Sequence, residues 1–270
     1  MSQKLVYAWV PGLPHLLRPD LNPSYAELAS ACKNIGMQFE KIGVKRILYY
    51  STQWLSVLGQ SVQARAHVSG VHVDENWYDI ASLEFDFKLD PSLAENLISL
   101  SREDGFQVRP VDYEGFPVDT GTIVANQLLN NAGVGTGMYS CCVYSDYEET
   151  IRIGRLMASA ASRLDGLTAI VAVSGLSGRY FTDKMDYSSD AIRDESDHRW
   201  NEKFLSAMND GRWSDIERLR ADYCREAKVD MGLKALAILK GAGACEPGRK
   251  LVTKAYGPIY GSGAAVLLGT

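Results

Sequence analysis

The sequence lacks the features that would assign it at once to a membrane-bound or nucleic-acid-binding class. No apolar run approaches the about 20 residues that a membrane-spanning helix needs. Positive charge is not in excess, because the formal net charge is -5, so we expect no nucleic-acid partner. Internal repeats, low-complexity tracts and long linkers are also missing. These absences predict no membrane association and one domain over residues 1–270.

Cysteine is sparse and widely spaced, which argues against a disulfide framework. The five cysteines are Cys32, Cys141, Cys142, Cys224 and Cys245. Their odd number, together with an opening segment MSQKLVYAWVPG that has no signal-peptide core, predicts reduced thiols in the cytoplasm. Cys141 and Cys142 are adjacent in an expected strand, so their side chains face opposite ways. We expect both to be small buried side chains without a chemical role.

The chain does contain enough apolar residues for a large core, with 46% hydrophobic and 23% charged residues in a length of 270. Apolar patterns predict strands that alternate with helices. The expected strands are residues 4–10, 44–51, 83–89, 106–112, 137–145 and 167–175, the expected helices are residues 23–42, 91–104, 120–131 and 146–164, and three further helices between 190 and 240 precede a closing strand and turn at 250–269. This alternation predicts an α/β fold in which helices cover both faces of a mixed central sheet.

Local signals mark several of these boundaries. Asn22 caps the first helix, which begins with proline, and Gly43 ends it. Asp146 and Glu149 have the spacing of a capping box at the start of a later helix. Strand 83–89 alternates apolar and charged residues, which indicates one solvent-facing side and an edge position. The remaining segments are loops, and in α/β folds functional residues gather in the loops at the C-terminal ends of strands.

Three such loops stand out: PGLPHLLRPD (11–20), STQWLS (51–56) and SGLSGRYF (174–181). The first carries His15, whose imidazole could meet a metal or a substrate at the rim of the sheet. A lone histidine is more often a hydrogen-bonded loop residue, and the sequence leaves both interpretations open. The small residues of SGLSG could cradle an anion with backbone N–H groups, but the segment lacks the spacing of a phosphate loop. It therefore indicates a close backbone approach only.

The other histidines and the acidic residues give weaker signals. His67 and His72 flank an expected turn at Gly70 and have no third ligand nearby, so we expect no metal there. His198 is expected on a solvated, charged helix face. The acidic run DESD (194–197) indicates a helix start and a solvent-facing side. The residues by themselves therefore predict an α/β protein with a polar pocket at the strand ends, and four histidines too scattered to define a metal centre.

Several segments, in their order along the chain, resemble the class III extradiol ring-cleavage dioxygenases, the protocatechuate 4,5-dioxygenase-type superfamily. In active members, two histidines and a glutamate hold iron(II), and a further histidine acts as acid and base. His15 matches the first ligand, which follows the first strand. STQW (51–54) matches the turn of the second ligand, and SGLSG (174–178) matches the acid/base turn. DMGLKALAILKGAGA (230–244) matches the helix that carries the glutamate.

The resemblance also implies that the chemistry of this site has been lost. Gln53 stands at the position of the second histidine, and an amide is a poor ligand for iron(II). Gly178 stands where the acid/base histidine is expected, and Gly232 stands at or near the position of the glutamate. We therefore expect a vestigial pocket lined by His15, Gln53, Ser177, Gly178 and Gly232. We expect no catalytic residue and no metal ligand set in this chain.

Within this superfamily, the length of the chain, its opening VPGLPHL and its ending YGPIYGSGAAVLL resemble a non-catalytic alpha chain. Such a chain pairs with a homologous, iron-bearing beta chain. The resemblance implies an assembly of two alpha and two beta chains, with Fe(II) in the beta subunit. The partner would open the ring of 2-aminophenol or of a chloro-substituted relative and consume oxygen.

Two other hypotheses remain open. The first is a stand-alone protein that binds a small molecule or another protein, as in the Memo-type relatives on the same fold. The second is a self-sufficient enzyme with an unusual metal set, built from His15 and carboxylates such as Asp119. For a subunit, a large apolar interface is expected. The aromatic residues that could contribute to it from loops or segment ends are Trp77, Tyr78, Phe116 and Tyr180.

Overall fold

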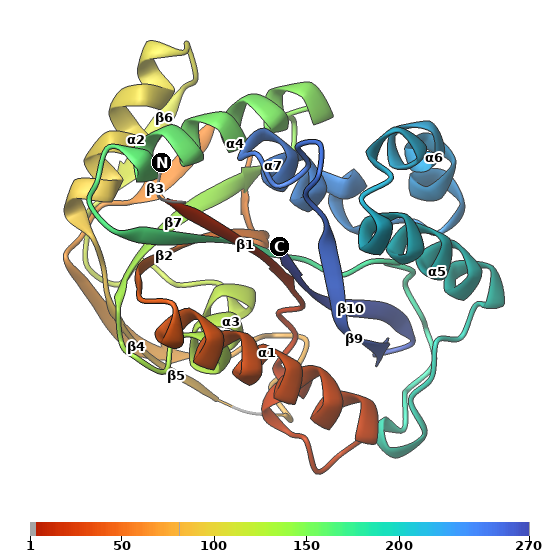
Figure 1. Ribbon diagram of the computed structural model, residues 1–270. Coiled ribbons are helices and arrows are strands. Elements are labelled where there is room, and N and C mark those ends of the chain that lie inside the picture. Colours follow the sequence, from red (N-terminus) through yellow and green to blue (C-terminus); the bar gives the residue numbers. More distant parts are fainter. Residues whose placement is uncertain (1–3, 81, 270) are drawn as a thin grey trace.

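A mixed eight-stranded sheet forms the centre of the computed structural model, which describes residues 4–80 and 82–269 (Figure 1). The strand order is β6-β3-β7-β2-β8-β1-β10-β9. The strands are β1 (Leu5–Val10), β2 (Val44–Ser56), β3 (Gln60–Gln63), β6 (Val108–Val111), β7 (Gly135–Cys142), β8 (Leu167–Val173), β9 (Leu251–Ile259) and β10 (Ser262–Gly269). Strands β7, β2, β8 and β1 are parallel. Strand β10 pairs antiparallel with both β1 and β9 at one side, and β3 pairs antiparallel with β7 at the other. The predicted mixed sheet is confirmed.

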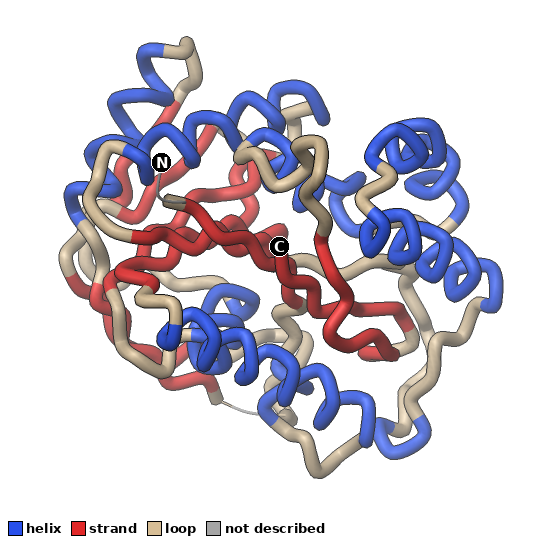
Figure 2. The backbone as a smooth tube through the Cα atoms, in the orientation of Figure 1, coloured by secondary structure: helices blue, strands red, loops and turns tan. Residues whose placement is uncertain are grey.

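Helices cover both faces of this sheet, as the alternation in the sequence predicts. Tyr7 and Trp9 of β1 pack into one core with α2, α4, α5, α6 and α7, whereas Ala8 and Val10 face the other core with α1 and α3. Figure 2 shows the strands as a middle layer between helices. The helices are α1 (Pro23–Lys41), α2 (Pro91–Glu103), α3 (Thr120–Leu129), α4 (Tyr147–Ser162), α5 (Glu195–Asp210), α6 (Trp213–Glu226) and α7 (Lys234–Gly241), with short 3-10 helices η1 (Pro14–Leu17), η2 (Tyr187–Ser189) and η3 (Asp230–Leu233).

The helix boundaries follow the local signals. Asn22 accepts a hydrogen bond from the backbone N–H of Ser24 at the start of α1, and both bonds of the capping box between Asp146 and Glu149 are present at α4. Gly43 follows α1 with a φ of 78°, a conformation that glycine adopts without strain. Among the described helices, none combines the length and the apolar character that crossing a membrane requires.

The five cysteines are unpaired, in agreement with the expectation of reduced thiols. Cys141 and Cys142 are buried at the end of β7, as predicted. Burial raises the pKa of the Cys141 thiol, which disfavours the reactive thiolate.

Strand β2 is longer than the strand 44–51 that the sequence predicts. Residues 51–56 were expected to form a loop, but β2 continues to Ser56. The pairing with β7 shifts between Tyr50 and Leu55 and then resumes opposite Cys141. This irregularity breaks the apolar alternation that marks a strand, so the sequence pattern ended too early. At the same end of the pairing, β7 stops at Cys142, opposite Ser56, rather than at residue 145.

The prediction that His67 and His72 flank a turn is wrong. They are the first and last residues of β4 (His67–His72), which pairs antiparallel with β5 (Leu83–Lys88) in a separate two-stranded sheet. Gly70 lies opposite Phe85, and a Cβ at Gly70 would stand 3.1 Å from the end of the phenyl ring. A side chain at position 70 would therefore require the Phe85 ring to shift by a few tenths of an ångström, so Gly70 favours this close contact within a strand. Strand β5 has the predicted solvent-facing side, but it lies outside the central sheet.

Candidate functional site: the strand-end loops

The carboxyl ends of three parallel strands lie level with one another. Val10 of β1 and Ser51 of β2 both pair with Val173 of β8. The segments that follow these residues therefore start at the same edge of the sheet, which is where α/β folds place their sites. Each of these segments carries one of the motifs that the sequence analysis singled out.

The carboxylate of Asp230 joins two of the motifs to the segment before α7. Its Oδ2 accepts hydrogen bonds from Thr52 Oγ1 at 2.7 Å and from Ser174 Oγ at 2.8 Å. The backbone N–H of Gly175 donates to the same oxygen at 3.0 Å. Sequence reasoning missed Asp230, although it is the first residue of the segment 230–244 that matches the family motif. Its role depends on donors that are 55 or more residues away in the chain, and no local pattern reports them.

Replacing Asp230 by alanine is expected to lower the free energy of unfolding by about 2 kcal/mol. Two buried hydroxyls, those of Thr52 and Ser174, lose an acceptor together with a backbone N–H. Urea unfolding measures the change. The matched control is Asp222→Ala, which removes an exposed carboxylate that pairs with Arg225 and is expected to change stability by less than about 1 kcal/mol. Equal effects of the two substitutions would contradict this role of Asp230.

His15 is fully buried in η1, and its two ring nitrogens have no hydrogen-bond partner. Aromatic rings from four other segments surround the imidazole. Burial lowers the pKa of His15 from 6.5 to about 4, and the nearby carboxylates of Asp79 and Asp74 only partly oppose this effect. The imidazole is therefore neutral at physiological pH.

Gln53 lies against the loop that leads to His15. Its Nε2 donates to the carbonyl oxygen of Gly12 at 3.3 Å. Asp119, which the unusual-metal hypothesis invoked, is beside it but is used as the cap of α3. It accepts hydrogen bonds from Ser51 Oγ at 2.6 Å and from the N–H and Oγ1 of Thr122. Burial raises the pKa of Asp119, and these hydrogen bonds oppose that shift.

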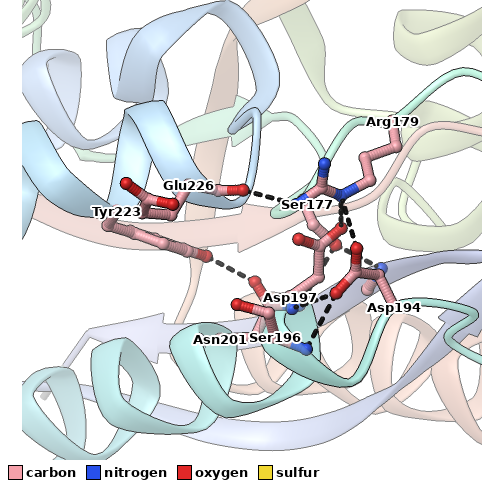
Figure 3. Close-up of polar contacts among 9 residues, drawn as sticks. Ser177, Arg179, Asp194, Ser196, Asp197, Asn201, Tyr223 and Glu226 are labelled. Atoms are coloured by element: carbon pink, nitrogen blue, oxygen red, sulfur yellow. Dashed lines mark hydrogen bonds and ion pairs between the residues drawn. The ribbon is translucent and has the colours of Figure 1, made fainter.

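Ser177 and Gly178 lie in the segment that follows β8, where Ser177 forms an isolated β-bridge with Val229. Ser177 Oγ accepts from the N–H of Gly263 at 2.8 Å and from Nδ2 of Asn201 at 3.2 Å, and the Tyr223 hydroxyl donates to Asn201 Oδ1 at 2.7 Å (Figure 3). A Cβ at Gly178 would stand 2.9 Å from the carbonyl oxygen of Lys228. Any side chain at position 178, including histidine, therefore requires a shift of the neighbouring backbone.

Gly232 lies in η3 within a run of left-handed residues. Met231, Gly232 and Leu233 all have positive φ, at 44°, 63° and 66°. A Cβ at Gly232 would meet no heavy atom within 4 Å. A side chain at this position has space, but it is strained by the backbone conformation.

An ion-pair cluster fastens the loop that follows β8, as Figure 3 shows. Arg179 Nε lies 2.8 Å from Asp197 Oδ2 and 3.2 Å from Asp194 Oδ2, and Arg179 Nη2 donates to the carbonyl oxygen of Glu226. Asp194 caps α5, as the sequence predicted. The prediction of a solvent-facing side is wrong for Asp197, which is buried. Burial raises the pKa of the Asp197 carboxyl, and Arg179 opposes that rise.

The remaining histidines each contact polar side chains outside the three strand-end loops. His67 pairs with Asp86 at 2.9 Å, and His72 Nε2 lies 3.0 Å from Thr120 Oγ1. His198 is half-buried rather than fully solvated, because its ring stacks on Tyr256 and its Nδ1 lies 2.9 Å from the Tyr256 hydroxyl. No group of three or more His, Cys, Asp or Glu within the described ranges is placed to hold a metal ion.

The residues at the three positions that the family resemblance assigns to metal ligands do not fit an iron(II) ion. His15 offers an imidazole that is fully buried. Gln53 offers a neutral amide that is hydrogen-bonded to the backbone, and Gly232 has no side chain that could bind a metal. The structure thus brings Gln53 to the loop of His15, and Ser177 and Gly178 to the segment of Asp230. A single pocket shared by all five residues stays a prediction.

The fold and the order of these loops define a ring-opening dioxygenase architecture. The chain belongs to the family described as the catalytic LigB subunit of aromatic ring-opening dioxygenase, whose model matches residues 10–266. The resemblance to the class III extradiol superfamily is confirmed. The chain is 36% identical over 266 residues to the 2-aminophenol 1,6-dioxygenase alpha subunit of a Pseudomonas species, with 96% of each chain covered.

The chain is also similar, at lower identity, to three other proteins. The beta subunit of 2-aminophenol 1,6-dioxygenase from a Pseudomonas species is 20% identical over 277 residues, with 95% of this chain and 90% of the relative covered. The 3,4-dihydroxyphenylacetate 2,3-dioxygenase of Escherichia coli is 19% identical over 222 residues, with 80% and 78% covered. The solved structure of an uncharacterized protein from Escherichia coli K12 has a TM-score of 0.67 at 16% identity, covers 98% of each chain and supports the fold alone.

Proposed function

We propose that this chain is the non-catalytic, structural subunit of a heteromeric dioxygenase that opens the ring of 2-aminophenol-type substrates. Fe(II) is held by a paralogous beta subunit, and the cytoplasmic assembly contains two chains of each kind. The single observation that carries this proposal is similarity over the whole chain to an alpha subunit of such an enzyme. That enzyme also has a beta subunit, to which this chain is more weakly similar.

The residues at the strand ends support an inactive role for this chain. Ring cleavage of this type needs a metal with open positions for the substrate and for dioxygen. Here an amide and a glycine occupy two of the three ligand positions, and glycine occupies the acid/base position. The fold is retained because it stabilises the partner and shapes its substrate channel.

Exposed apolar side chains support an assembly. Tyr78 is 72% exposed and Tyr180 fully exposed, so both remain available to a partner. By contrast, Trp77 packs against His15 inside this chain, and Phe116 packs against neighbouring aromatic rings. Further exposed apolar side chains are found on either side of a hydrogen-bonded junction between the end of β2 and the segment after β7: Leu55, Val57, Leu58 and Tyr144. Surfaces of this kind promote association.

The isolated chain is expected to contain no stoichiometric iron and to show no turnover of 2-aminophenol. Co-expression with the beta subunit is expected to yield one complex in size-exclusion chromatography and to raise the thermal stability of both chains. The activity of the beta subunit is expected to rise in the complex, through support of its fold rather than through a residue donated to the chemistry. Metal analysis, oxygen consumption and thermal melting measure these outcomes.

Two experimental outcomes would assign this chain a different function. Iron near one equivalent per isolated chain, with turnover of 2-aminophenol, would establish a self-sufficient enzyme instead. A fully active beta subunit that elutes separately from this chain at micromolar concentration would leave a stand-alone binding protein as the better account.

A further inference from the structure

The imidazole of His15 is the centre of a cluster of rings that come from separate parts of the chain. We call the four surrounding side chains the aromatic plug: Tyr25, Trp77, Tyr187 and Tyr260. Their ring centroids lie 5.4, 4.8, 5.1 and 5.7 Å from that of His15, and the first three rings meet it edge to face. Trp77 and Tyr260 also pack on each other at 4.4 Å. Such edge-to-face contacts bring rings to van der Waals distance.

The plug leaves no space at the nitrogens of His15. A first-row metal binds imidazole at about 2.0–2.1 Å and needs further space for its other ligands on the far side. Both nitrogens of His15 are shielded from water and have no hydrogen-bond partner, and the side chain is fully buried. A site that excludes a water molecule at the nitrogen also excludes a metal with open positions. The N–H of the neutral ring can still face an aromatic ring, which is a weak but favourable contact.

Hydrogen bonds to Asp190 hold two tyrosines of the aromatic plug in place. The Tyr25 hydroxyl donates to Asp190 Oδ2 at 2.6 Å. The same carboxylate accepts from the backbone N–H groups of Tyr260 and Gly261, at 2.5 and 2.7 Å. Asp190 is itself buried. The carboxylate thus ties α1 to the turn between β9 and β10.

The other two rings of the plug belong to segments that cover His15 from the loop side. Trp77 lies in the connection between β4 and β5, and its backbone N–H donates to the carbonyl oxygen of Asp74. Asp74 Oδ2 in turn accepts from Thr120 Oγ1 at the start of α3. The Tyr187 hydroxyl contacts Asp79 Oδ2 at 3.4 Å. The connection is therefore anchored at both sides of Trp77.

We propose that the aromatic plug occupies the coordination space of the former metal site, so that restoring the lost ligand side chains does not by itself restore metal binding. The inference rests on the proposed function, because it gives a physical reason for the inactivity of this chain. Trp77 is the residue of the aromatic plug best suited to substitution, since it lies in the connection between β4 and β5 rather than in the central sheet. His15 is retained as the apolar centre on which four segments pack.

Carbethoxylation of histidines, followed by mass spectrometry, tests the enclosure of His15 directly. In the unmodified protein, His67, whose side chain is 56% exposed, is expected to react at least tenfold faster than His15. Trp77→Ala is expected to make His15 reactive at a rate close to that of His67. Tyr78→Ala is the matched control, because this neighbouring side chain is exposed and its loss leaves His15 protected. Equal reactivity of His15 and His67 in the unmodified protein, or no effect of Trp77→Ala, overturns the proposal.

Cobalt(II) binding tests the consequence for a metal. The double variant Gln53→His with Gly232→Glu restores the ligand set implied by the family, and a third variant adds Trp77→Ala. The triple variant is expected to bind Co²⁺ at least tenfold more tightly, followed by its visible absorption and by calorimetry. Equal binding by the two variants, whether tight or absent, overturns the proposal. Neither experiment involves a partner subunit or activity, so the proposed function can fail without affecting these results.

Discussion

Replacing Arg179 by methionine is expected to lower the free energy of unfolding at pH 7 by about 3 kcal/mol. The substitution keeps much of the side-chain volume but removes the charge that pairs with the buried carboxylate of Asp197. Asp194, whose carboxylate lies 3.2 Å from the same guanidinium nitrogen, then adds a second unpaired negative charge. Removing one partner of a buried ion pair lowers stability more than removing one partner of an exposed pair, because the remaining charge is left without water or a partner.

The pH dependence identifies the cause of this loss. Burial raises the pKa of Asp197 in the folded chain, and removal of Arg179 raises it further. A carboxyl whose folded pKa is above its unfolded value binds the proton more readily when folded, so the variant gains stability as the pH falls towards that pKa. The gap between the variant and the unmodified protein is therefore expected to narrow from pH 7 to pH 5. Urea unfolding at both values measures it.

A second substitution provides the control. Asp197→Asn removes the buried charge while retaining a side-chain acceptor, so the double variant with Arg179→Met is expected to recover more than half of the lost stability. A cost below about 1 kcal/mol for Arg179→Met would place this pair with ordinary surface ion pairs. A cost that is the same at both pH values would rule out the unpaired carboxylate as its source.

Acidification is expected to remove about 3 kcal/mol of stability through His15 alone between pH 7.5 and pH 4. Its folded pKa is lowered by burial to about 4, whereas the unfolded chain binds the proton near 6.5. Below pH 6.5 the unfolded state therefore holds a proton that the folded state does not accept. The loss is absent above about pH 7.5, grows as the pH falls, and levels off below the folded pKa.

The comparison variant is His15→Phe, which keeps an aromatic ring at the centre of the plug and has no titratable group. At pH 7.5 its stability is expected to be close to that of the unmodified protein, because the two nitrogens of His15 have no hydrogen-bond partner. At pH 4 the variant is expected to be the more stable of the two. Carboxylates elsewhere contribute equally to both chains, so the difference between the two urea-unfolding series isolates His15. An identical loss in both series would show that His15 does not govern the acid response.

Local chemistry made much of the fold predictable. The capping box of Asp146 and Glu149 and the cap at Asn22 depend on side chains that bond to backbone two or three residues away. The alternation of buried strands with amphipathic helices likewise follows from residues close together in the chain. Such interactions are present in the sequence itself, so the mixed sheet with helices on both faces was predicted correctly, whereas the short strands β3 and β4 were missed.

Patterns failed where a distant contact decided the conformation. Glycine is frequent in turns, yet Gly70 lies in a strand, where the absence of a side chain leaves space for the ring of Phe85. The irregular pairing after Tyr50 extends β2 beyond its apolar run, because β7 supplies the hydrogen bonds. Asp197 lies in an acidic stretch that reads as a solvent-facing helix start, but Arg179 and the packing of α5 bury it.

The sequence by itself determined the fold class and the family resemblance. It also determined the side chains at the positions that the resemblance assigns to metal ligands, and a glycine or an amide there cannot provide an imidazole or a carboxylate. Only the tertiary structure decided the surroundings of the residues at the strand ends. Asp230 accepts hydrogen bonds from β2 and from the segment after β8, and His15 is enclosed by rings from four segments. The physical reason is that both arrangements depend on groups far apart in the chain, whose distances are set by the packed sheet and its helices rather than by neighbouring residues.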